Sequence, residues 1–108
     1  MDAEYLPEQL TREQADALPG GVVLQFGTNW CGYCRAAGPK IDQALTDAPV
    51  QRVFIEDGKG RPLGRSYQVK LWPTLIFLAN GTEVARVVRP WKAEEVTAGL
   101  EELTAALA

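Results

Sequence analysis

Two cysteines, Cys31 and Cys34, are the residues of this chain whose type and spacing could do chemistry. They follow a predicted buried strand and open a predicted helix, so both thiols lie on the first helical turn and can meet in a disulfide. In the chain-entropy model a four-residue loop closed by a disulfide gains only about 2 kcal/mol of stability. Reversible thiol-disulfide exchange is therefore a better reason for the pair than stapling.

The start of a helix suits a reactive thiol. A free cysteine is mostly protonated at neutral pH, whereas the nucleophile is the thiolate. Free N–H groups, notably that of Cys34, and the positive end of the helix dipole can favour the thiolate of Cys31 by roughly 2 kcal/mol. We expect Cys31 to attack a substrate disulfide and Cys34 to resolve the mixed disulfide. The alternatives for such a pair are half of a zinc site or two inert core thiols.

The chain contains no histidine, which excludes Ser-His-Asp triads, Cys-His nucleophiles and imidazole metal sites. Cys31, Cys34 and Met1 supply the only sulfur atoms, too few for a four-sulfur zinc or iron-sulfur site. We therefore expect no metal and no bound cofactor, only a redox-active Cys31–Cys34 disulfide.

Length and composition predict one globular domain spanning residues 1–108, with 46% hydrophobic and 23% charged residues. The net charge of -3 argues against nucleic-acid binding, and no apolar run approaches the length of a membrane span. Asp2, Glu4, Pro7 and Glu8 do not resemble a secretion signal. We expect a cytoplasmic monomer, or a periplasmic protein if a leader has been removed.

Local patterns predict the elements that position the cysteines. A capping box from Thr11 to Gln14 starts a short helix that Pro19, Gly20 and Gly21 end. An Asn80-Gly81 pair predicts a hairpin. The expected strands cover residues 22–26, 51–55, 75–78 and 83–88, and the expected helices cover 31–47 and the segment from Lys92 onward, with a brief helical turn at 65–69.

The order of these elements predicts an α/β fold: a central mixed sheet with helices on both faces. The run at residues 22–26 is apolar on both faces except for Gln25, so we expect it in the middle of the sheet.

Several segments together resemble the thioredoxin family. The segment from Trp30 to Cys34, with Pro39 five residues further on, is similar to the family's active-site helix. Trp72-Pro73-Thr74 before a strand, followed by the hairpin, is similar to its cis-proline segment. The resemblance implies a thioredoxin-like fold, Cys31 as the attacking thiol, Cys34 as the resolving thiol and a cis Pro73 beside them.

The same resemblance implies a binding surface for substrate around the dithiol, with the backbone of Trp72 exposed for pairing with an extended peptide. It also implies disulfide-containing protein substrates and a reductase that donates electrons. The residues expected to shape this surface are Trp30, Gly32, Tyr33, Trp72, Pro73, Thr74 and Arg89.

Gln25 stands where thioredoxins usually carry a buried aspartate below the second cysteine. An amide cannot accept a proton at neutral pH, so we expect slower resolution by Cys34. The alternative is that Gln25 satisfies a local hydrogen bond while a water or Glu56 does the proton work.

Three further positions depart from the family. The dipeptide between the cysteines is Gly-Tyr where Gly-Pro is usual, which frees the N–H of Tyr33 and predicts a somewhat more oxidising protein. Trp72 is bulkier than the usual aliphatic residue, and Arg89 replaces a common glycine. Trp91 either anchors a partner beside them or packs under the last helix.

The sequence thus predicts a protein thiol-disulfide oxidoreductase that reduces protein disulfides. One alternative is a cell-envelope disulfide oxidant or isomerase. Another is a binding module that presents Trp72 and Arg89 to a partner and whose affinity switches with redox state.

Overall fold

The computed structural model describes residues 4–7 and 10–108. Met1, Asp2 and Glu8, which entered the arguments about sulfur ligands and the absence of a leader, lie outside the described residues. The elements in chain order are α1 (Arg12–Asp16), β1 (Gly21–Gly27), α2 (Gly32–Leu45), β2 (Gln51–Glu56), α3 (Pro62–Ser66), β3 (Thr74–Ala79), β4 (Thr82–Val88) and α4 (Ala93–Leu107).

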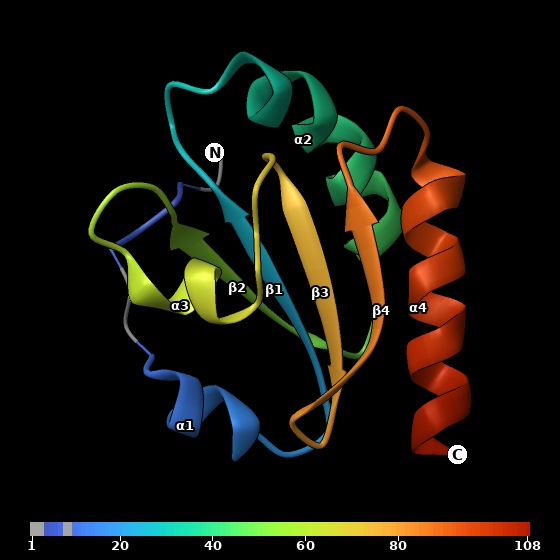
Figure 1. Cartoon of the computed structure of the whole chain (residues 1–108). Helices are drawn as coiled ribbons and strands as arrows, with labels where there is room; N and C mark the ends of the chain where they lie inside the picture. The colour runs from blue at the N-terminus through green and yellow to red at the C-terminus, as the bar shows by residue number, and fades with distance from the viewer. Residues whose placement is uncertain (1–3, 8–9) are drawn as a thin grey trace.

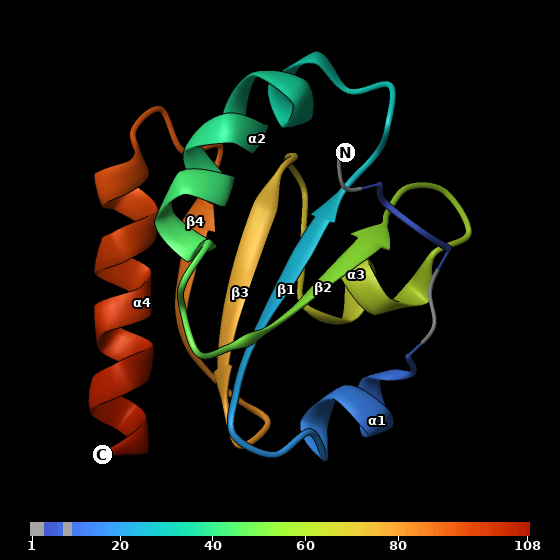
Figure 2. The same cartoon turned by 180° about the vertical axis from the view of Figure 1, so that it is seen from behind.

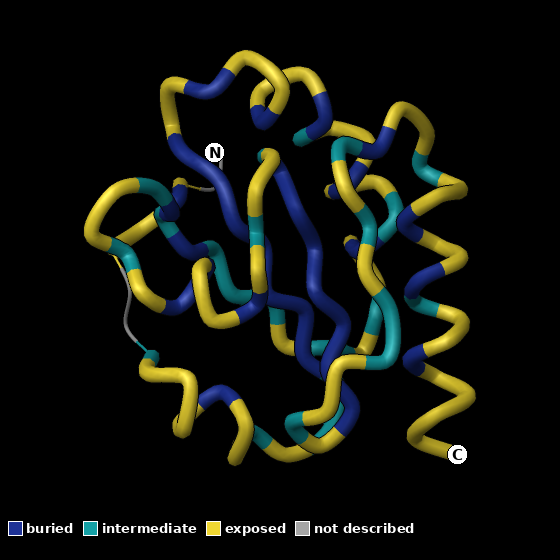
Figure 3. Tube along the Cα trace, viewed as in Figure 1, coloured by how far each residue is buried: buried dark blue, intermediate teal, exposed yellow. Residues whose placement is uncertain are grey.

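The four strands form one mixed sheet in the order β2-β1-β3-β4 (Figure 1). β1 pairs in parallel with β2 and antiparallel with β3, and β3 pairs antiparallel with β4. The two inner strands are buried along nearly their whole length (Figure 3), as expected for segments that read as apolar on both faces. The expected α/β architecture is confirmed.

Helices cover both faces of the sheet. α3 lies in front of the strands in Figure 1, and α2 comes to the front when the molecule is turned in Figure 2. Side chains alternate along β1, so Val22 and Leu24 pack toward α1 and α3, whereas Val23 packs toward α2 and α4. Two apolar layers therefore hold the sheet, and β1 carries α2 at its carboxyl end.

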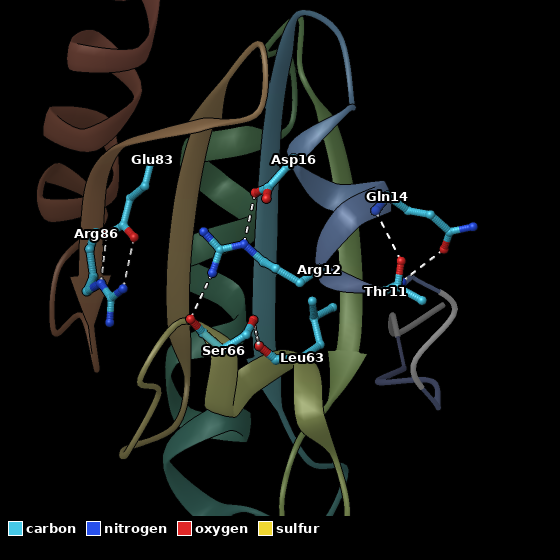
Figure 4. Close-up of polar contacts among 8 residues, drawn as sticks. All are labelled: Thr11, Arg12, Gln14, Asp16, Leu63, Ser66, Glu83 and Arg86. Carbon is cyan, nitrogen blue, oxygen red and sulfur yellow. Dashed lines mark hydrogen bonds and ion pairs between the residues drawn. The ribbon is translucent and has the colours of Figure 1, made fainter.

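α1 begins with the expected capping box: the Gln14 N–H donates to Thr11 Oγ1 at 3.1 Å and the Thr11 N–H donates to Gln14 Oε1 at 2.9 Å (Figure 4). Arg12 joins this short helix to α3, because its guanidinium donates to the Ser66 carbonyl at 2.8 Å and to Asp16 at 2.9 Å. The same guanidinium lies 3.9 Å from the centre of the Tyr67 ring. These contacts clamp α1 onto the face that α3 covers.

The hairpin between β3 and β4 forms at the predicted residues. Asn80 and Gly81 have φ values of 50° and 85°, the left-handed conformations that a two-residue turn requires. Gly81 also lies against the Asp16 carbonyl so closely that a side chain there would clash. The turn thus needs glycine for two reasons.

One helix differs from its sequence-based expectation. The turn expected at residues 65–69 is a helix at Pro62–Ser66, because Pro62 occupies its first turn, where a missing N–H costs nothing.

In the part of the chain that the structure describes, no helix is long and apolar enough to cross a membrane.

Residues 4–7 lie along the outer side of β2. Leu6 forms a parallel bridge with Ile55, and the Glu56 N–H donates to the Leu6 carbonyl at 2.7 Å. This pairing brings Tyr5 toward the carboxyl end of the sheet, where α2 begins.

Candidate active site

Cys31 is the N-cap of α2. Its backbone is extended, with φ -78° and ψ 121°, and its Sγ accepts a hydrogen bond from the Cys34 N–H at 3.3 Å. The helix dipole and this N–H both favour negative charge on the sulfur. Both cysteines are free thiols, and Cys31 is only 7% exposed.

Cys34 lies one turn into α2 and is buried. Burial, reinforced by the neighbouring Cys31, raises its pKa to about 12. Hydrogen bonding by the Thr28 backbone and by the Tyr5 side chain acts in the opposite direction and lowers that pKa. Cys34 is therefore held as a protonated thiol in the dithiol form, as a resolving cysteine must be until the first exchange step is complete.

The Trp72–Pro73 peptide bond is cis, and Trp72 packs against the cluster formed by Tyr5 and the two cysteines. Thr74 starts β3 with its side chain buried, and its hydroxyl donates to the Leu71 carbonyl at 2.6 Å. Thr74 therefore stabilises the cis-proline turn through this buried hydrogen bond and is not part of the exposed surface.

Aromatic side chains surround the mouth of the site. Trp30 and Tyr33, on either side of Cys31, are 72% and 50% exposed. The Trp30 ring meets the Trp72 ring edge-on, with centroids 5.8 Å apart, and the Trp72 Nε1–H donates to Asp57 at 2.8 Å. Gly32 contacts nothing at the position of a side chain, so the surface between the aromatic residues is open.

Arg89 closes one side of this surface. Its φ of 49° lies in the left-handed region that favours glycine. The Arg89 Nε–H donates to the Trp72 carbonyl at 2.8 Å, and its guanidinium lies 3.8 Å from the centre of the Tyr33 ring. The carbonyl of Trp72, expected to be exposed for a substrate peptide, is therefore occupied by Arg89.

Trp91 does not pack under α4: its side chain is 70% exposed, so that alternative is wrong. Its N–H donates to the Glu95 carboxylate at 3.0 Å at the start of α4. The indole borders a small hollow of about 40 Å³ that Tyr33 and Arg89 also line. Trp91 thus extends the aromatic surface around Cys31.

Gln25 lies on β1, where it is 1% exposed and hydrogen-bonded at both ends of its amide. Its Oε1 accepts two hydrogen bonds from Arg52, at 3.0 and 2.7 Å, and its Nε2 donates to the Tyr5 hydroxyl at 2.7 Å. Tyr5 and Arg52 were missed by the sequence analysis. No local pattern marks them, since they lie 20 and 27 residues from Gln25 along the chain.

Glu56, considered as an alternative proton acceptor, forms an ion pair with Arg61 at 2.6 Å. The cavity that reaches Cys34 has a volume of about 510 Å³, and Tyr5, Gln25 and Arg52 line it. Glu56 is not part of that lining.

Among residues 4–7 and 10–108, no cluster of three or more His, Cys, Asp or Glu could hold a metal ion.

The fold and this site define a class of protein: a thiol-disulfide oxidoreductase that works with a pair of cysteines at the tip of a helix. Cys31 can attack a disulfide sulfur of a substrate. Cys34, whose N–H already donates to Cys31 Sγ, can then close the internal disulfide.

The chain belongs to the thioredoxin family, whose profile matches residues 9–102. It is similar to the structure of thioredoxin 2 from Pseudomonas aeruginosa PAO1 in its reduced form, with 47% identity, a TM-score of 0.85 and coverage of 98% of this chain and 99% of that one. It is also 32% identical to a thioredoxin of Echinococcus granulosus over 82% of this chain and 86% of that protein. Thioredoxin-2 of Saccharomyces cerevisiae is 33% identical over 70% of this chain and 77% of that protein. The expected family and its thiol-disulfide exchange are thereby confirmed.

Proposed function

We propose that this protein reduces disulfides of folded or partly folded proteins, receiving electrons from a thioredoxin reductase. The observation that carries the proposal is the placement of the Cys31 sulfur at the base of a surface lined by exposed aromatic residues. There the sulfur accepts a hydrogen bond from the Cys34 N–H at 3.3 Å. Such a surface suits a protein segment, because aromatic side chains dominate protein recognition. The dithiol itself carries the electrons, so the exchange needs no bound cofactor.

The reaction begins when the Cys31 thiolate attacks one sulfur of the substrate disulfide. A bond forms between Cys31 Sγ and that sulfur, and the other substrate sulfur leaves as a thiolate and takes up a proton from water. Cys34 then gives its proton to water and attacks Cys31 Sγ. The Cys31–Cys34 bond forms as the bond from Cys31 to the substrate sulfur breaks, which releases the second substrate thiolate. Two electrons have passed from the dithiol to the substrate, and a reductase restores the dithiol.

Reduction in this direction requires a steady supply of electrons, which fits a reducing compartment such as the cytoplasm. We therefore propose a cytoplasmic monomer as the working form. The redox state of the cysteine pair in growing cells tests this part: a predominantly dithiol form supports it, and a predominantly disulfide form points to an oxidant of the cell envelope.

Insulin reduction tests the reductase activity, first with dithiothreitol and then with NADPH and a thioredoxin reductase as the electron source. We expect turnover in both assays and none for Cys31→Ser. Binding of protein partners that persists after both cysteines are replaced, with no turnover of the wild type, would instead support a binding module.

A further inference from the structure

We propose that Tyr5 is a positioning residue for the resolving step: its phenol, oriented by Gln25 and Arg52, donates a hydrogen bond to the Cys34 sulfur and so takes part of the role of the missing carboxylate. The proposal concerns the exchange chemistry at the two cysteines. It rests on that exchange and not on which protein disulfides are reduced.

The orientation of Gln25 carries the first step of the argument. Oε1 of Gln25 accepts both N–H groups of the Arg52 fork, at 3.0 and 2.7 Å, and only the carbonyl end of an amide can do so. The Nε2 end must therefore face Tyr5, whose hydroxyl oxygen it meets at 2.7 Å. Because Gln25 donates here, the Tyr5 oxygen is an acceptor of this bond and its own proton remains free for another partner.

The Cys34 sulfur is placed to be that partner. A Cβ atom built on Gly27 would lie 2.6 Å from Cys34 Sγ and 2.7 Å from Tyr5 Cζ, so the two side chains meet over the same backbone atom of β1. Tyr5 and Cys34 also belong to one buried cluster. A Tyr5 hydroxyl that donates to this sulfur would lower the pKa of Cys34, against the larger effect of burial.

Tyr5 is held firmly enough to act as a positioning group. Its N–H donates to Asn29 Oδ1 at 2.8 Å, and the Asn29 amide donates back to the Tyr5 carbonyl at 3.1 Å. Its ring meets the Phe54 ring edge-on at 5.5 Å. Asn29 belongs to the loop that leads into Cys31, so the same contact ties Tyr5 to the active-site turn.

Burial raises the pKa of Tyr5 above its ordinary value of 10.0, so the phenol stays protonated and acts as a donor, not as a base. The other charged groups around the cavity that reaches Cys34 are Glu4, Arg35, Asp42 and Arg52. Asp42 is engaged with Arg52 at 2.7 Å and its side chain is 57% exposed. Tyr5 thus combines a neutral donor with a place in the same buried cluster as the Cys34 sulfur.

The step can be written with its atoms balanced. In the mixed disulfide, Cys34 gives its proton to water in the cavity, and the Tyr5 O–H stabilises the thiolate that remains. That thiolate attacks Cys31 Sγ, the Cys31–Cys34 bond forms, the bond from Cys31 to the substrate sulfur breaks, and the substrate thiolate leaves. Arg52 donates to Gln25, Gln25 donates to Tyr5, and Tyr5 donates to the Cys34 sulfur. The positive charge of Arg52 therefore strengthens the hydrogen bond from Tyr5 to that sulfur.

The test separates the two exchange steps. A symmetrical nitrophenyl disulfide releases one coloured thiolate when Cys31 attacks and a second when Cys34 resolves, and stopped-flow absorbance follows both across pH. We expect Tyr5→Phe to slow the second release about tenfold, the effect of losing a hydrogen bond to a charged group, and to move its pH profile to higher pH. The first release should stay at the wild-type rate.

Tyr67→Phe is the matched control, because the buried Tyr67 hydroxyl has no hydrogen-bond partner among the described residues. It should leave both releases unchanged. Gln25→Met keeps the side-chain length but removes the amide that orients Tyr5, and it should slow the second release in the same direction, which keeps the test usable if one variant fails to fold. Equal second-release rates and profiles in wild type and Tyr5→Phe, or equal slowing of both releases, would overturn the proposal. Failure of the first release in the wild type would instead count against the exchange function itself.

Discussion

Arg89 donates from its Nε to the carbonyl oxygen of Trp72 at 2.8 Å, directly beside the cis peptide bond that Trp72 makes with Pro73. An extended substrate that pairs with the backbone of Trp72 must displace this contact first. Arg89 also covers one face of Tyr33, so its guanidinium links the cis-proline turn to the active-site helix. The binding surface is therefore partly closed in the free protein.

Removing the Arg89 side chain should open that surface. We expect Arg89→Gly and Arg89→Met each to raise kcat/KM for an uncharged, extended peptide disulfide about fivefold, because the substrate no longer has to break a hydrogen bond. Steady-state reduction of such a peptide measures this. Because Arg89→Met keeps a side chain at φ 49°, a gain confined to Arg89→Gly would assign the effect to the backbone and not to the covered carbonyl.

A carboxylate at position 25 should restore a base near Cys34. Gln25→Asp and Gln25→Asn have side chains of equal length, so their comparison removes the effect of shortening the side chain. We expect the charged variant to resolve the mixed disulfide at least about tenfold faster than Gln25→Asn at neutral pH, with an extra inflection in its pH profile. Superimposable profiles for the two variants would show that a base at this position does not help.

The reduced protein should lose stability in alkali. The folded state raises the pKa of Cys34 from its ordinary value of 9.0 to about 12, so the unfolded chain loses this proton first as the pH rises. The contribution is fully present below about pH 9 and is lost as the pH approaches about 12. The slope is at most about 1.4 kcal/mol per pH unit for this group.

Urea unfolding at several pH values above 9 measures that slope. Cys34→Ser and the oxidised protein serve as controls, because neither has a Cys34 thiol to titrate. Both should show a shallower decline than the reduced wild type. An identical decline in all three would mean that Cys34 does not contribute to it.

Gly27 should tolerate no side chain. A Cβ there would lie 2.6 Å from Cys34 Sγ and 2.7 Å from Tyr5 Cζ, closer than packed atoms approach. We expect Gly27→Ala to lower the free energy of unfolding by about 2 kcal/mol, the usual cost of overpacking. Gly32→Ala, where a Cβ meets nothing within 4 Å, should change it little, and equal effects in chemical denaturation would contradict the crowding argument.

Trp91 should matter for protein substrates and not for folding. Its side chain is 70% exposed, so Trp91→Ala should change the free energy of unfolding by less than about 0.5 kcal/mol. We expect kcat/KM for insulin to fall about fivefold or more, as for loss of a binding aromatic, while reduction of a small aryl disulfide is unchanged. Leu107→Ala, an exposed apolar residue at the other end of α4, is the control.

The local features of this protein could be predicted from its sequence. The Thr11 capping box, the Asn80-Gly81 turn, the buried β1 strand and the placement of Cys31 at a helix start all depend on residues near one another in the chain. Backbone conformation and side-chain periodicity determine such features, and the resemblance to thioredoxins added the cis-proline turn.

What surrounds the two sulfurs was decided only by tertiary structure. Tyr5 reaches Cys34 because its neighbour Leu6 pairs with β2, and Arg52 meets Gln25 because β2 lies beside β1. Arg89 reaches the Trp72 carbonyl from the far end of β4. No short-range pattern encodes these contacts, because they arise when strands and loops distant in sequence are packed together and each buried polar group must find a partner.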